Sequence, residues 1–193
     1  MALHSFPSAL LMFTDLLFYA AIFCAYLYML LVIWSILYPR YRIWPPGQVS
    51  WKLFLAWGVF YPLAGLALML MVRDWNAWRI PHEIRWALGF PLVLLGLGLV
   101  VWGIYTLGLK HTHGVRGHFV TRGPYRFTRN PQYVGDIVML IGLALMANSM
   151  LVTVVNALII LSFILMPWAE ELWLEEAYGQ EYLHYKTIVP RFL

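Results

Sequence analysis

Two polar stretches interrupt an otherwise apolar chain, and both carry side chains that could do chemistry. The first runs from Lys110 to Gln132 and is rich in glycine, histidine and arginine. The second begins at the adjacent carboxylates Glu170 and Glu171 and continues to Arg191. Charged groups at the edge of apolar segments suit a site where a charged molecule meets an apolar one. We therefore expect the chemistry where these two stretches meet.

The ionisable residues of these stretches differ in what they predict. Glu170 lies within one turn of an apolar run, where a carboxylate is costly and by default marks a site. Glu175 and Glu176 suit the solvated face of a surface helix, and arginines in a short loop also serve as topological signals. His111 and His113 are only two candidate ligands, joined by no cysteine or carboxylate pattern, so no metal site is predicted.

The composition predicts an integral membrane protein. Hydrophobic residues make up 62% of the 193 residues and charged residues only 11%, whereas soluble domains carry about a quarter charged residues. We expect membrane lipids and a lipophilic small molecule or lipid as partners, and no nucleic acid. The N-terminus lacks a basic region and a cleavage site, so the first apolar stretch is expected to be a retained helix.

The apolar runs predict an all-α membrane protein with five transmembrane helices. A spanning helix needs about 20 mostly apolar residues. Asn148 and Ser149 form a short turn between the last two segments, which should make an antiparallel hairpin and bring Tyr133 close to Glu170. Glycines in the third segment should permit close helix packing. The five segments are approximately Leu10–Tyr38, Leu53–Val72, Ile84–Leu109, Tyr133–Ala147 and Leu151–Trp168.

The distribution of basic residues predicts the orientation. Ten of the 13 Lys and Arg residues follow the first or third segment or lie in the tail, and the other three follow the second segment. The positive-inside rule then places the N-terminus outside and the C-terminus in the cytoplasm, with a cytoplasmic pocket where the two polar stretches meet. We expect residues 1–109 to form three N-terminal helices. Residues 110–193 should form the loop, the hairpin and an amphipathic tail of the same structural unit.

Two sequence blocks resemble the signature of a known family. The sequences FVTRGPYR and RNPQYVG resemble the central motif of the isoprenylcysteine carboxyl methyltransferases and related phospholipid methyltransferases. A second block resembles the closing motif of that family and follows in the same order. The resemblance covers roughly residues 107–193. The blocks are Phe119–Arg126 with Arg129–Gly135, then Glu170–Leu172, Tyr178–Tyr185 and Val189–Arg191.

This resemblance implies a membrane-embedded methyltransferase that uses S-adenosylmethionine and a lipophilic or amphiphilic acceptor. Glu170 could pair with the cofactor's ammonium, Tyr125 and Tyr133 could face its sulfonium, and the backbone at Gly123 could approach it closely. No catalytic residue is assigned. By position in the family motifs, the implied cofactor contacts are Gly117, His118, Phe119, Val120, Tyr125, Asn130, Pro131, Gln132, Tyr133 and Glu170.

Two positions depart from the pattern of the prenylcysteine enzymes. Asn130 stands where histidine is usual, and an asparagine cannot act as a general base near neutral pH. Those enzymes also have an arginine one helical turn before the glutamate, and this chain has Met166 at that position. We therefore do not expect a prenylcysteine carboxylate as acceptor, and a thiol, an amine and a hydroxyl all remain open. The alternatives are an NADPH-dependent membrane reductase resembling the sterol and steroid reductases, and a noncatalytic membrane binding module.

Overall fold

Four helices in the structure are long and apolar enough to cross a membrane: α1, α2, α3 and α6. The computed structural model describes residues 6–192, and no β-strand lies among them. In chain order the elements are α1 (Phe6–Leu37), η1 (Pro39–Tyr41), α2 (Trp51–Arg73), α3 (His82–Leu107), α4 (Leu109–Thr112), η2 (Gly123–Arg126), α5 (Pro131–Ala147), α6 (Met150–Tyr178) and α7 (Gln180–Ile188).

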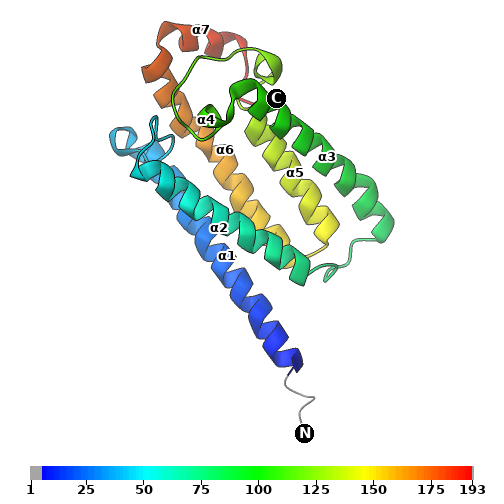
Figure 1. Ribbon diagram of the computed structural model, residues 1–193. Coiled ribbons are helices and arrows are strands. Elements are labelled where there is room, and N and C mark those ends of the chain that lie inside the picture. Colours follow the sequence, from blue (N-terminus) through cyan, green and yellow to red (C-terminus); the bar gives the residue numbers. More distant parts are fainter. Residues whose placement is uncertain (1–5, 193) are drawn as a thin grey trace.

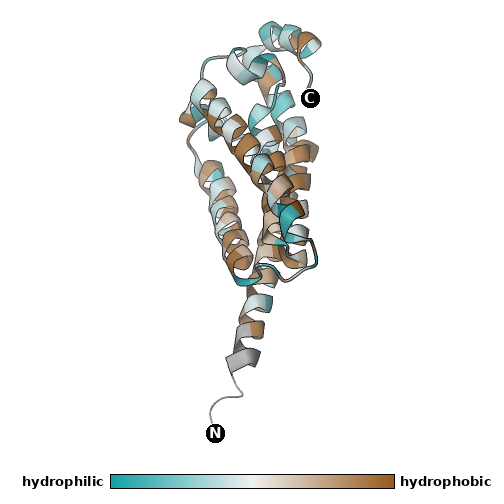
Figure 2. Cartoon of the chain, turned by 90° about the vertical axis from the view of Figure 1, so that its right-hand side faces the viewer, coloured by the Kyte–Doolittle hydropathy of each residue, from teal (hydrophilic) through white to brown (hydrophobic). Residues whose placement is uncertain are grey.

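All five predicted segments are helical, so the predicted all-helical membrane fold is confirmed (Figure 1). α5 is shorter than the others, with 17 residues, which corresponds to about 26 Å of helix. The long helices are mainly hydrophobic, and the hydrophilic residues gather toward their ends and in the connections (Figure 2). This distribution is that of a chain whose middle lies in lipid and whose ends reach water.

The bundle contains three close helix pairings: α3 with α5, α1 with α2, and α1 with α6 (Figure 1). The glycines of α3 allow its pairing with α5, as the sequence predicted. A Cβ atom on Gly96 would lie 2.5 Å from both the Gly135 carbonyl oxygen and the Met139 nitrogen. A Cβ atom on Gly89 would lie 2.9 Å from the Gly142 carbonyl oxygen. The backbones of these two helices therefore touch, and only glycine fits at the contact.

The predicted turn between the last two long helices is also present. Asn148 adopts the left-handed conformation with φ of 50°, and the Ser149 hydroxyl accepts the Val152 N–H at 3.0 Å, which caps α6. The α2–α3 loop lies against this turn, since the Asn76 N–H donates to the Ala147 carbonyl at 2.8 Å. α5 and α6 therefore form the expected antiparallel hairpin.

The predicted end of the last span was too early. We expected this segment to stop at Trp168, where the apolar run ends, but α6 continues to Tyr178 and ends before Gly179, whose φ is 55°. The sequence AEELWLEEAY at residues 169–178 is rich in strong helix formers, so the helix outlasts its apolar stretch. As a result, the acidic residues of the second polar stretch stand on a rigid helix.

Three segments meet at the end of the bundle opposite the turn at Asn148 and Ser149. The Gly47 N–H donates to the Gly114 carbonyl at 2.9 Å, which joins the α1–α2 loop to the first polar stretch. The Arg129 N–H donates to the Pro190 carbonyl at 2.9 Å, which joins that stretch to the tail. The α1–α2 loop with the first turn of α2, the first polar stretch and the tail together carry ten of the 13 Lys and Arg residues. They share one end of the molecule, as predicted from their charges; we call it the polar end.

Candidate active site

A cavity of about 310 Å³ lies at the polar end and extends between the helices. Its size falls at the lower end of the range for small-molecule sites, about 300–1,000 Å³. The part within the bundle is largely apolar, and the part near the loops contains histidine, arginine and tyrosine side chains. The apolar lining includes Ala56, Phe60, Val100, Ile104 and Phe163, and the polar lining includes His111, His118, Arg129, Tyr178 and Tyr182.

Eight of the ten site residues predicted from the sequence line this cavity, namely His118, Phe119, Val120, Tyr125, Asn130, Gln132, Tyr133 and Glu170. The other two are not part of its lining. Gly117 packs against the His111 ring, and its carbonyl accepts the Tyr178 hydroxyl at 3.0 Å. Pro131 is buried as the first residue of α5, where a missing N–H leaves no hydrogen bond unmade.

Glu170 is held in the cavity wall by two donors. The Trp44 indole N–H donates to its carboxylate at 2.7 Å, and the Tyr133 hydroxyl donates to the same oxygen, Oε1. Trp44 also approaches the Tyr133 hydroxyl at 3.3 Å, and the Tyr133 ring stacks on Phe163 with centroids 5.7 Å apart. The expected proximity of Tyr133 and Glu170 is confirmed, and Trp44 completes the cluster.

Tyr125 is fixed by contacts from two helices. The Gln132 amide donates to its hydroxyl at 2.9 Å, and the Tyr185 hydroxyl donates to its backbone carbonyl at 2.6 Å. Burial raises the pKa of the Tyr125 phenol well above its usual range and raises the pKa of Tyr185 to about 12. Both phenols therefore stay neutral near neutral pH, and η2 is held between α5 and α7.

An aromatic cluster packs the middle of the first polar stretch onto the tail. The Phe119 ring lies 5.1 Å from that of Tyr178, 5.4 Å from that of Tyr185 and 6.0 Å from that of Tyr182, measured between centroids. Tyr182 and Tyr185 are buried in α7. Aromatic pairs at these distances stabilise the fold by more than the burial of their apolar area alone. The loop beside the cavity is thus anchored by α6 and α7.

Asn130 and Gly123, which we expected at the site, also stabilise the fold around it. The Asn130 side chain is buried, and its amide donates to the Arg191 carbonyl at 2.9 Å. The expected approach of the Gly123 backbone to the cofactor stays a prediction, and Gly123 has a packing role of its own. Gly123 packs on Thr106 of α3, whose hydroxyl would lie 2.7 Å from an added Cβ, and it does not line the cavity. Its φ of 62° supplies the turn that begins η2.

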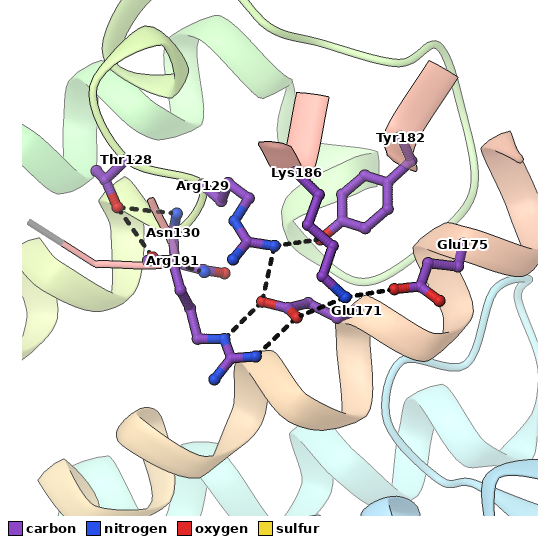
Figure 3. Close-up of polar contacts among 8 residues, drawn as sticks. All are labelled: Thr128, Arg129, Asn130, Glu171, Glu175, Tyr182, Lys186 and Arg191. Carbon is purple, nitrogen blue, oxygen red and sulfur yellow. Dashed lines mark hydrogen bonds and ion pairs between the residues drawn. The ribbon is translucent and has the colours of Figure 1, made fainter. Parts of the chain in front are cut away.

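The two adjacent carboxylates of α6 have different partners. Glu170 faces the cavity, whereas Glu171 faces the tail and is only 5% exposed. Arg191 binds Glu171 through two nitrogens at 2.6 and 2.8 Å, and Arg129 binds it at 3.1 Å. Lys186 lies 3.6 Å from the same carboxylate (Figure 3). We call Glu171 and these three cations the Glu171 clamp; it connects α6, α7, the tail and the first polar stretch.

Among the lining side chains that sequence reasoning missed, three polar ones bear on the chemistry of the site. Trp44 comes from the α1–α2 loop, for which the sequence indicated only an excess of basic residues. Tyr28 lies within α1, and its hydroxyl donates to the Met166 sulfur at 3.3 Å. Asp136 lies one helical turn beyond Tyr133 in α5. A tryptophan before two prolines and a carboxylate inside an apolar run were visible signals for Trp44 and Asp136; Tyr28 offered none.

The fold and the cavity define a class: a helical membrane protein whose site joins polar loops to the apolar interior of the bundle. Residues 84–181 match the model of the phospholipid methyltransferase family. This is half of the chain, and the chain belongs to that family.

Curated relatives come from both branches that the motifs resemble. A protein-S-isoprenylcysteine O-methyltransferase of Rattus norvegicus is 33% identical over 122 residues, 58% of this chain and 43% of that protein. A phosphatidylethanolamine N-methyltransferase B of Dictyostelium discoideum is 35% identical over 75 residues, 36% of this chain and 38% of that protein. The chain spans about half the length of the curated relatives it matches. No solved structure matches it significantly.

Proposed function

We propose that this chain is a membrane-embedded methyltransferase that uses S-adenosylmethionine to methylate a lipophilic or amphiphilic acceptor. Membership in the phospholipid methyltransferase family supports the reaction class. The observation that carries the proposal is the position of Glu170, a carboxylate held by Trp44 and Tyr133 in the wall of a cavity that is polar near the loops and apolar within the bundle.

The residues around Glu170 fit such a cofactor. A carboxylate in a partly desolvated wall can pair with the ammonium of S-adenosylmethionine through charge-assisted hydrogen bonds. The rings of Tyr133 and Phe119 line the same cavity, and an aromatic face stabilises a desolvated cation by roughly 1–2 kcal/mol. S-adenosylmethionine supplies an electrophilic methyl group when bound. The loop residues His118 and Val120 would then contact the rest of the cofactor.

The apolar part of the cavity suits the acceptor. Val100, Ile104 and Phe163 come from helices that span the bilayer, so a lipophilic tail can lie among them. The protein's main contribution would be to hold the acceptor in line with the methyl group, and orientation of this kind can lower a barrier by about 7–11 kcal/mol. Met166 lines the cavity and supplies no cation for a carboxylate acceptor.

The same proposal includes the orientation in the membrane. The polar end carries the three basic connections and would face the cytoplasm, with the N-terminus on the outside. The cofactor would then enter from the cytoplasm, and the acceptor would enter from the bilayer. Accessibility labelling of the two termini in intact cells tests this orientation directly.

The proposal is tested by calorimetric titration of the purified protein with S-adenosylmethionine and, separately, with NADPH. We expect the first to bind. Because a hydrogen bond to a charged group contributes about 1.5–3 kcal/mol, Glu170→Gln should weaken that binding about tenfold or more. Tyr133→Ala should weaken it as well, whereas Glu176→Ala, at an exposed side chain paired with Arg42, should not.

Three results would count against the proposal. Preference for NADPH would favour the reductase, and binding of neither compound would favour a noncatalytic module. If Glu170→Gln bound S-adenosylmethionine with unchanged affinity, Glu170 would not be the partner of the cofactor's ammonium. Equal losses in Glu170→Gln, Tyr133→Ala and Glu176→Ala would point to general destabilisation. With binding established, a labelled methyl group appearing on a component of a lipid extract would show the transfer itself.

A further inference from the structure

Asp136 is a carboxylate in the apolar part of the cavity. It follows Tyr133 by three residues in α5, so it lies on the same helix face and about 4.5 Å further from the polar end. Asp136 lines the cavity together with Tyr28 and Phe163. Among residues 6–192 its carboxylate has no hydrogen bond and no ion pair.

A carboxylate in this position needs a partner. Within an apolar helix, an ionisable group without a partner is costly, and such groups usually serve a ligand or a proton. The other carboxylate of the cavity, Glu170, already has two donors, Trp44 and Tyr133. By contrast, Asp15 in α1 is exposed on the outside of the bundle and does not line the cavity. The cavity contents are therefore the remaining source of a partner for Asp136.

The charges of the cavity wall determine what kind of partner fits. In the part of the chain that the structure describes, the lining contains two carboxylates, no lysine and one arginine, Arg129. That arginine is already paired with Glu171 at 3.1 Å. The two lining histidines, His111 and His118, belong to the first polar stretch at the loop side of the cavity. A phosphate or carboxylate beside Asp136 would therefore meet a like charge and neither a lysine nor an unpaired arginine. A group that donates a hydrogen bond and becomes positive would instead be stabilised.

We propose that Asp136 binds the reacting nitrogen of the acceptor and makes the pocket selective for a lipophilic amine that carries no neighbouring anionic group. This inference rests on the proposed methyltransferase function and deepens it by naming the acceptor class. A carboxylate is too weak a base to deprotonate a hydroxyl before attack, whereas a neutral amine needs no prior deprotonation. The amine enters from the bilayer uncharged and donates one N–H to Asp136.

The transfer balances with these groups alone. The nitrogen lone pair forms the new C–N bond, and the C–S bond of the cofactor breaks, with its electron pair left on sulfur as a neutral thioether. The positive charge moves from sulfur to nitrogen, beside the Asp136 carboxylate. The methylated nitrogen keeps its proton, so the product leaves as an ammonium and Asp136 remains a carboxylate for the next cycle. Asp136 thus stabilises the charge that develops on nitrogen during the reaction.

The test compares four acceptors with methyl-labelled S-adenosylmethionine and the full-length protein in lipid nanodiscs. They are a long-chain alkylamine, a long-chain alkanethiol, phosphatidylethanolamine, and a farnesylated cysteine with a free carboxylate. We expect the alkylamine to have the highest kcat/KM. Asp136→Asn should lower that value about tenfold or more, because the charge-assisted contact is lost, while calorimetry finds the cofactor affinity unchanged.

Two further variants separate this role from general effects. Asp136→Glu keeps the carboxylate and should retain more alkylamine activity than Asp136→Asn. Asp15→Asn removes an acidic residue from an apolar helix away from the cavity and should leave the activity unchanged. The proposed role of Asp136 would be overturned if Asp136→Asn changed kcat/KM for the alkylamine only slightly. It would also be overturned if this variant lost S-adenosylmethionine binding to the same extent as activity.

The acceptor comparison is decisive even if Asp136→Asn does not fold. Preference of the wild-type protein for phosphatidylethanolamine, the farnesylated cysteine or the thiol would overturn the inference while leaving the methyltransferase function intact. Failure of the wild-type protein to bind S-adenosylmethionine would instead overturn the proposed function itself. The two failures are therefore distinguishable.

Discussion

Replacing Glu171 by glutamine should open the Glu171 clamp. The carboxylate is the shared partner of Arg129, Arg191 and Lys186 (Figure 3). The side chains of Glu171 and Arg129 are only 7% and 9% exposed, so the variant leaves a buried guanidinium without its anion. Removing one partner of a buried ion pair typically costs about 3–5 kcal/mol.

The other two cations add less to this figure. The side chains of Arg191 and Lys186 are 28% and 36% exposed, so water screens them, and Lys186 retains Glu175 at 2.6 Å. We therefore expect a loss of about 3 kcal/mol, at the lower end of the range for a buried pair. For a chain of this size the melting temperature should fall by about 6–12 °C.

Thermal unfolding in a mild detergent measures the loss, and hydrogen exchange locates it. Glu176→Gln is the matched control, because its carboxylate is 61% exposed and pairs only at the surface with Arg42. That pair should contribute less than about 1 kcal/mol. Exchange should rise in residues 180–192 for Glu171→Gln and not for the control. Equal shifts in both variants, or a Glu171→Gln shift as small as the control's, would refute the assignment of Glu171 as a buried clamp.

Two further predictions concern the helix contact and the cavity wall. Gly96→Ala should lower the melting temperature of the detergent-solubilised protein, because overpacking typically costs about 1–3 kcal/mol. Gly98→Ala is the control, since nothing lies within 4 Å of its added Cβ. Equal effects of the two variants would contradict the close α3–α5 contact. Trp44→Phe removes the indole donor to Glu170 and should weaken S-adenosylmethionine binding about tenfold by calorimetry, whereas Trp51→Phe, at an exposed ring, should not.

Several features of the molecule followed from the sequence because their signals are local. The shortage of charged residues predicted a membrane protein, and a turn at Asn148 between two apolar runs predicted the hairpin. That hairpin was enough to place Tyr133 beside Glu170, since antiparallel neighbours joined by a short turn bring their distant ends together. The resemblance to the family motifs implied ten cofactor contacts, of which eight line the cavity. The other inferences needed only composition, periodicity or chain order.

The sequence singled out Glu170 for the site, but it could not predict what its neighbour Glu171 binds. Glu170 and Glu171 are adjacent, yet one lines the site and the other binds the tail. Helix geometry turns neighbouring side chains by roughly 100°, so their roles depend on how α6 is rotated against its neighbours. The same limit applies to Gly123, which packs on Thr106 instead of facing the cavity.

The sequence by itself thus determined the class of protein, the hairpin and the family, because these are recorded in composition and in contiguous motifs. Only the tertiary structure decided that Trp44 holds Glu170, 126 positions away, and that Tyr28 meets Met166, 138 positions away. It also decided that Asp136 faces the cavity without a partner among the described residues. Contacts across such separations depend on the packing and register of whole helices, which short sequence patterns do not specify.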